Sequence, residues 1–326
     1  MQITRSLTFI LVASSLSACN LFDGGGDSST VCVEGARAVQ ASDGRTLCLS
    51  LSTVAQAPFQ AGFFTARVTH RLHLTDAEGR AVDVGQDPLI GTIDVRPLMV
   101  MNSGHEHGTP QAASFEDSSD PAQGRYDWVA YYIMPSGPMM GRWYVQVSLE
   151  DRGAADPLRL EFQPEVALVA APDVFSARLN NAVDETANMA GGSLRRPYTV
   201  WLHEVVPVQG GGHRLTLFLS TQDAVTMEMG GMTMKHVVFP ALIPGQTRLH
   251  DLQGSERTVG TVTLRVSLDE GATWIDLEHQ GAGRYAAMLT GMAPGQRQVL
   301  ALDLAVDGLA MTTSAGAAGQ LSFLVP

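Results

Sequence analysis

Methionine and histidine gather in three short windows of this sequence. Nine of its 14 methionines lie in residues 99–108, 134–143 and 227–236. A thioether sulfur is a soft, uncharged donor that needs no deprotonation, and imidazole is a compatible second donor. This pair suits Cu(I), whereas Mg²⁺ and Ca²⁺ prefer carboxylates. The candidate copper ligands are Met99, Met101, His105, His107, Met134, Met139, Met140, Met227, Met229, Met232, Met234 and His236.

The window 227–236 reads MEMGGMTMKH and predicts a β-hairpin. Gly230 and Gly231 form a favoured two-residue loop, because the tight hairpin turns need positive φ. A reversal there pairs Met229 with Met232, Met227 with Met234 and Val225 with His236, and places all six on one face. The alternative is a straight core strand with a glycine bulge, in which the same alternation only separates inside from outside.

The other two windows also have a packing interpretation. Met99 and Met101 share one face of a predicted strand, where methionine is a serviceable core filler. Met134, Met139 and Met140 lie among prolines and glycines, which favours an irregular turn. A zinc site at His105 and His107 is a further alternative, although two alternating histidines are a weak signal.

The first 30 residues have the pattern of a targeting segment and a tether. Arg5 precedes an apolar run at residues 7–16 that is too short to span a bilayer. The following Leu-Ser-Ala-Cys resembles a bacterial lipobox, which implies removal of residues 1–18 and a lipid on Cys19; ordinary secretory cleavage near Ala18 is the alternative. The residue after the cysteine is Asn20 rather than Asp, which resembles lipoproteins that are sorted to the outer membrane. Residues 19–30 are rich in glycine and serine and predict a flexible tether.

Two further cysteines remain after lipidation of Cys19. Exported thiols within reach of each other usually pair, so we expect a disulfide between Cys32 and Cys48. Pairing takes both out of the set of metal ligands. A blue-copper centre, which needs a cysteine ligand, is therefore disfavoured.

Composition predicts an all-β chain of two domains. The 326 residues include 33 glycines and 16 prolines, and apolar residues alternate in short runs without long helical periodicity. We expect two tandem immunoglobulin-like β-sandwiches at residues 31–165 and 197–326, separated by a junction at residues 166–196. Gly-Arg-Tyr occurs at residues 124–126 and again at residues 283–285, which indicates two copies of one sandwich. The expected strands include residues 64–74, 92–95, 214–220, 258–268 and 299–306.

The first domain resembles the YtkA-like and FixH-like families of small exported β-sandwich domains. The resemblance covers residues 63–149 and rests on a turn at 76–79, Met-x-Met and Gly-His, Gly-x-Tyr, and a Met-rich turn before Gly-x-Trp. It implies an immunoglobulin-like fold associated with copper supply or cytochrome oxidase assembly. The matching positions are Met99, Met101, His105, Met134 and the core residue Trp143. A lipid anchor in place of a membrane helix, an acidic loop at 116–120 and a second domain depart from the family pattern.

These features together predict an envelope lipoprotein that binds copper, as Cu(I), and acts as a carrier or buffer. We expect it on the outer membrane facing the periplasm, held by its lipid and served by a copper donor or acceptor protein. A net charge of −12 gives no basis for nucleic-acid binding. Neither a His-Glu-x-x-His nor a Gly-x-Ser-x-Gly motif is present, so no enzyme is predicted. The alternative is a structural or adhesion module without metal, in which the methionines are buried.

Two histidines outside the windows have structural interpretations. His70 alternates with apolar residues and is expected to be a hydrogen-bonded core residue. His73 faces the other way and is expected in solvent.

Overall fold

Antiparallel strands form nearly all of the regular structure, as alternating apolar and polar residues require. The computed structural model describes residues 32–56, 59–60, 66–102, 106–112, 114–134, 136–137, 141–166, 170–171, 173–188, 192–229 and 232–326. In these residues no α-helix occurs, and the helical structure is the 3₁₀ turn η1, Pro121–Gln123. The prediction of an all-β chain is confirmed. The predicted signal segment and tether, including Cys19, lie outside the described residues.

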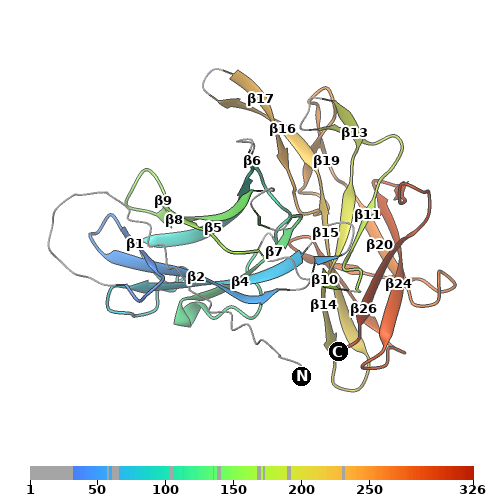
Figure 1. The fold of residues 1–326 in the computed structure, drawn as a ribbon, viewed down its shortest axis with the longest axis horizontal. Coiled ribbons are helices and arrows are strands. Elements are labelled where there is room, and N and C mark those ends of the chain that lie inside the picture. The colour runs from blue at the N-terminus through green and yellow to red at the C-terminus, as the bar shows by residue number, and fades with distance from the viewer. Residues whose placement is uncertain are drawn as a thin grey trace, which may run out of the picture. The chain divides into compact units, whose positions relative to one another are not determined.

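Two four-stranded sheets make the first sandwich (Figure 1). One has the order β1-β2-β4-β7 and the other the order β6-β5-β8-β9. Their bounds are β1 Arg37–Gln40, β2 Thr46–Gln56, β4 Ala66–Asp76, β5 Ile90–Val100, β6 Glu106–His107, β7 Arg125–Tyr132, β8 Arg142–Asp151 and β9 Leu158–Phe162. β3, Phe59–Gln60, pairs in parallel with β10, Ala170–Ala171.

The inner faces of these two sheets enclose one hydrophobic core. Leu49 and Leu72 come from the first sheet, and Val145 and Val147 from the second, and all four are fully buried or nearly so. Burying one such side chain stabilises a fold by about 1.5–3 kcal/mol. His70 is buried in the same sandwich and bonds Tyr132 Oη at 2.8 Å, whereas His73 is exposed. Both predictions for these histidines are confirmed.

The second sandwich has two five-stranded sheets around its own core. The first sheet has the order β11-β14-β15-β23-β22, and in the second β21-β20-β24-β25 is extended by β26 on β24. The strands are β11 Ser176–Leu179, β14 Tyr198–Pro207, β15 His213–Thr221, β20 Val262–Ser267, β21 Ile275–Asp276, β22 Glu278–Gly281, β23 Arg284–Leu289, β24 Arg297–Val306, β25 Leu309–Met311 and β26 Gly319–Leu324. Two-stranded ribbons complete it, namely β12 Glu185–Ala187 with β13 Ser193–Arg195, β16 Asp223–Met229 with β17 Met232–Val238, and β18 Arg248–His250 with β19 Glu256–Thr258.

The stretch 166–196, expected to be an irregular junction, contains strands of the second sandwich. β11 pairs with β14, so that Ser176 lies opposite Trp201 and Leu179 opposite Tyr198. The sequence signal was weak because these strands are short and β12 and β13 form a separate ribbon.

The two sandwiches repeat one corner in detail. Gly124 and Gly283 both have positive φ, 63° and 78°, and each precedes an arginine and a buried tyrosine. The backbone amides of Leu74 and Leu219 donate to the carbonyls of Gly124 and Gly283, at 2.8 Å and 2.9 Å. A Cβ at Gly124 would clash with the Leu74 carbonyl oxygen, and one at Gly283 would be 2.8 Å from the Ala241 Cβ, so both the positive φ and the lack of space favour glycine.

The tyrosines that follow these glycines complete the equivalence. Tyr126 donates its hydroxyl to the Val82 carbonyl at 3.1 Å, and Tyr285 donates to the Leu242 carbonyl at 2.9 Å. The amides of Val82 and Leu242 in turn bond the carbonyls of Leu74 and Leu219. Each sandwich therefore uses the same corner to tie a loop to two neighbouring strands.

An aromatic cluster joins the two sandwiches within the compact unit Cys32–Pro326. Tyr131 of β7 stacks on Phe218 of β15 with ring centroids 4.5 Å apart and lies 5.1 Å from the ring of Trp201. All three side chains are buried. Aromatic stacking of this kind adds about 0.5–1.5 kcal/mol per pair beyond the area buried.

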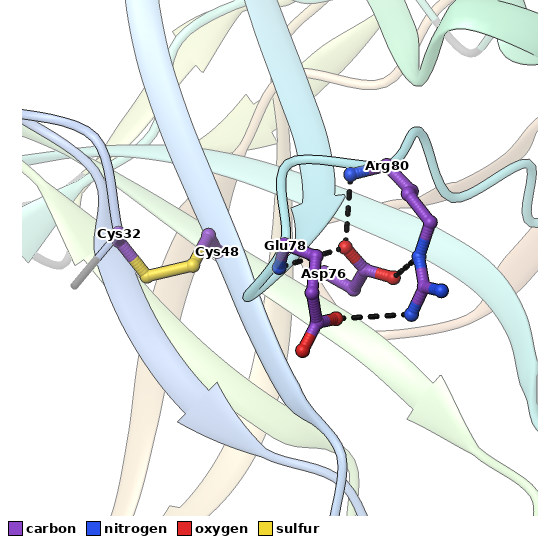
Figure 2. Close-up of a disulfide and its surroundings, with 5 residues drawn as sticks. All are labelled: Cys32, Cys48, Asp76, Glu78 and Arg80. Carbon is purple, nitrogen blue, oxygen red and sulfur yellow. Dashed lines mark hydrogen bonds and ion pairs between the residues drawn. A yellow bond between two sulfur atoms is a disulfide. The ribbon is translucent and has the colours of Figure 1, made fainter. Parts of the chain in front are cut away.

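The predicted disulfide is present. Cys32 and Cys48 are bonded with their Cα atoms 5.6 Å apart, which ties the chain before β1 to β2 (Figure 2). The chain-entropy model gives about 3 kcal/mol for a loop of this length. Figure 2 also shows the predicted turn after β4, in which Asp76 accepts hydrogen bonds from the backbone amides of Glu78 and Arg80.

Candidate metal centre

Three strands place Met99, His107 and Trp143 in one row. Met99 of β5 lies opposite His107 of β6 on one side and opposite Trp143 of β8 on the other. Residues directly opposite in a sheet share a face, and here it is the core face. Met99 and Trp143 are fully buried, His107 is 3% exposed, and the His107 and Trp143 rings meet edge to face at 5.6 Å.

The Met-rich turn after β7 packs against this row. Trp143 donates its Nε1–H to the Met134 carbonyl at 2.8 Å, and Met134 contacts the same hydrophobic core as Met101. Gly141 lies so close to β5 that a Cβ there would be 2.9 Å from the Met101 Cα. The described parts of the windows 99–108 and 134–143, which are separate in sequence, are therefore brought together in the first sandwich.

The hydrogen bonds of His107 determine its tautomer. His107 Nδ1 lies 3.0 Å from the Gly108 carbonyl oxygen, and because a carbonyl can only accept, Nδ1 carries the proton. The lone pair is then on Nε2. This nitrogen is buried and has no hydrogen-bond partner among the described residues.

Burial also favours the neutral ring. It lowers the pKa of His107, and the hydrogen bond to the Gly108 carbonyl opposes this only in part. A neutral imidazole with one nitrogen held by a carbonyl and the other carrying a free lone pair is the form that binds a metal ion. Met99, which lies opposite His107, is buried, and Met101 and Met134 are half-buried against the same hydrophobic core.

The third window forms the expected hairpin. β16 and β17 pair with Met229 opposite Met232, Met227 opposite Met234 and Val225 opposite His236, as predicted. The side chains of these four methionines lie outside what the structure describes, as do Gly230 and Gly231. The register is confirmed, whereas metal binding by the hairpin stays a prediction.

The hairpin also meets the first sandwich. β17 contacts β6, and Arg96 of β5 donates to His236 Nε2 at 3.3 Å. Burial and the positive charge of Arg96 lower the pKa of His236, and Glu106 acts against them. Because Nε2 accepts from Arg96, a metal ion would have to use Nδ1 or displace that arginine.

The remaining predicted ligands, His105, Met139 and Met140, lie outside the described residues. Within the described part of the chain, no group of three or more His, Cys, Asp or Glu side chains is placed to hold a metal ion. No helix in these residues is long and apolar enough to cross a membrane.

Sequence reasoning missed a polar cluster between the sandwiches. The His203 ring bonds Tyr131 Oη at 2.7 Å and Glu116 at 3.1 Å, and Arg284 donates to Glu116 at 2.7 Å. These residues come from four distant parts of the chain, and no local pattern joins them. Tyr131 is fully buried, and this chain of hydrogen bonds joins the two sandwiches.

The comparisons do not assign the chain to a family. No protein-family model matches it, and no curated protein matches it either.

Proposed function

We propose that this protein is a lipid-anchored protein of the bacterial envelope that binds Cu(I) as a carrier or buffer. The principal site is the end of the first sandwich, where His107 lies beside Met99 in the same row of the sheet. The Met-rich hairpin β16–β17 is a second binding element. The partners in this proposal are a copper donor or acceptor protein and the membrane, which is reached through a lipid on Cys19.

The observation that carries the proposal is the buried Nε2 of His107, which has no hydrogen-bond partner among the residues that the structure describes. A buried polar atom without a hydrogen bond costs about 1–3 kcal/mol, and such atoms in native proteins call for an explanation. A soft cation bound by Nε2 and by thioether sulfurs would satisfy this nitrogen. The donor set fits Cu(I) and fits a hard, oxygen-seeking cation poorly.

A structural or adhesion module remains the second candidate, and one observation favours it. Met99 has no exposed surface and belongs to the hydrophobic core, as packing alone would require. In that case His107 is a core residue, and neither methionine window binds metal.

An anaerobic titration separates the two candidates. The purified full chain is titrated with Cu(I) in competition with a chromogenic chelator, and the tryptophan fluorescence of the chain is followed because the Trp143 ring lies 5.6 Å from that of His107. We expect at least one Cu(I) per chain, with quenching of the tryptophan signal. His107→Gln should weaken binding about tenfold or more, since it removes a ligand.

The matched control is His73→Gln, which changes an exposed histidine on β4 of the same sandwich. It should bind Cu(I) as the parent does. A chain that takes up no Cu(I) refutes the proposal, and equal affinities of the parent and His107→Gln would remove His107 from the site.

A further inference from the structure

A polar cavity of about 330 Å³ lies between the two sandwiches, away from the methionines. Its wall includes Arg67 and Thr69 of β4, Glu116, His203 of β14, Thr216 of β15 and Arg284 of β23. The volume is at the small end of the range for ligand sites in proteins. Only a small molecule fits.

Most of the charges around this cavity are paired. Glu116 accepts from His203 at one carboxylate oxygen and from Arg284 at the other. Burial alone would raise the pKa of Glu116, but the His203 hydrogen bond and the charges of His203, Arg284 and Arg67 leave that pKa below its ordinary value. Glu116 is therefore ionised. Arg214, which also lines the cavity, donates to Glu204 at 2.9 Å.

Arg67 also lines this cavity, where its charge acts on Glu116 and its guanidinium makes a side-chain hydrogen bond with Tyr131. It lies opposite Tyr131 in the β4–β7 pair, and no carboxylate of the described residues forms an ion pair with it. Its Nε–H is buried without an acceptor among the described residues, and the same is true of the Nε–H of Arg284. A half-buried guanidinium with a buried Nε–H that lacks an acceptor among the described residues can take an anion there.

The rest of the wall selects the kind of anion. Arg67, Arg214 and Arg284 face Glu116, Asp117 and Glu204 on this wall, so the cavity has no net positive charge and disfavours a dianion. A single carboxylate can still pair with Arg67, which forms no ion pair with the described residues. The hydroxyls of Thr69 and Thr216 can exchange hydrogen bonds with hydroxyl groups of a ligand. We propose that this cavity binds a small hydroxylated monocarboxylate, whose carboxylate pairs with Arg67. This site is independent of copper.

Calorimetric titration of the purified full chain tests the proposal. The probes are D-lactate and D-glucuronate, two hydroxylated monocarboxylates of different size, with uncharged D-glucose and inorganic phosphate as comparisons. We expect one of the two monocarboxylates to bind at least tenfold more tightly than glucose and more tightly than phosphate.

Two variants locate the binding. Arg67→Gln should weaken it about tenfold or more, because a charge-assisted hydrogen bond is lost, and Arg67→Lys should restore part of it. Since Arg67 makes no ion pair with the described residues, its loss should leave the fold intact, which circular dichroism checks. Arg248→Gln, which alters an exposed arginine paired with Glu256 outside the cavity, should bind as the parent does.

The proposal is overturned if neither monocarboxylate binds, or if Arg67→Gln binds as tightly as the parent. Tighter binding of phosphate than of both monocarboxylates would also overturn it, by showing that the cavity selects a different class of anion.

Discussion

His70 places a titratable ring inside the core of the first sandwich. Its side chain is fully buried, stacks on Trp128 with centroids 5.5 Å apart, and bonds Tyr132 and, at 3.5 Å, Thr53. These neighbours carry no charge that could stabilise a protonated imidazole. Burial accordingly lowers the pKa of His70 from 6.5 to about 3.

This residue should make stability depend on pH. Between pH 6.5 and about 3 the His70 ring is protonated in the unfolded chain but stays neutral in the folded protein. The contribution of His70 to the free energy of unfolding is therefore fully present above pH 6.5, the pKa in the unfolded chain. It falls by about 1.4 kcal/mol for each pH unit between 6.5 and about 3. Urea unfolding at pH 7, 6 and 5 should show a shallower decline for His70→Gln than for the parent.

The same substitution at exposed His73 controls for the loss of a histidine. Equal declines in the parent and His70→Gln would show that the buried ring does not govern acid sensitivity.

At the residue scale, the sequence indicated the candidate ligands but could not indicate their burial. His105 and His107 looked equivalent in the sequence, and the register of β5 with β6 is what turns His107 toward the core. Likewise, no local pattern could place Arg67, Glu116 and Arg284 around one cavity, because they come from both sandwiches and meet only where the two pack together.

At the scale of elements, the hairpin β16–β17 is a case in which the local sequence alone was enough to predict the turn and the strand pairing. Two glycines between alternating residues specified the turn, and the turn specified the register of seven pairs. The strands in residues 166–196 were harder to predict from the sequence, because β11 to β13 are each only three or four residues long and form strands only through pairing with other segments.

Replacing two methionines tests whether this hairpin binds metal. Met227 and Met234 lie opposite each other, so Met227→Leu with Met234→Leu removes two thioethers from one place. Stability should change by less than about 1.5 kcal/mol, because the exchange conserves volume. The affinity for Cu(I), measured by chelator competition, should fall.

Met288→Leu is the control, because it removes an exposed thioether from β23 instead. If the double variant keeps the parent's affinity, the hairpin is packing only, and the copper site is the one around His107.

At the scale of the whole molecule, composition and periodicity predicted the all-β class, and the repeated Gly-Arg-Tyr predicted that two sandwiches share a plan. The contacts of Tyr126 and Tyr285 show this equivalence. The aromatic cluster that joins the sandwiches could not be predicted, because a strand residue such as Tyr131 gives no sign of which neighbour will cover it.

Anchoring also belongs to the molecule as a whole. The resemblance of residues 16–19 to a lipobox leads us to expect that Cys19→Ser prevents lipidation, since serine lacks the thiol that carries the lipid. Metabolic labelling with a fatty-acid probe should mark the parent but not the variant. Continued labelling of Cys19→Ser would contradict the assignment.

The corner formed by Gly-Arg-Tyr occurs in both sandwiches, but its arginine has a different ion-pair partner in each. Arg125 and Arg284 follow equivalent glycines, yet Arg125 pairs with nearby Asp120, whereas Arg284 reaches Glu116 in the other sandwich. If the two copies descend from one ancestral domain, an arginine of common origin pairs within its own sandwich in one copy and with the other sandwich in the second copy. Under that descent, two residues with the same origin would differ in their tolerance to mutation.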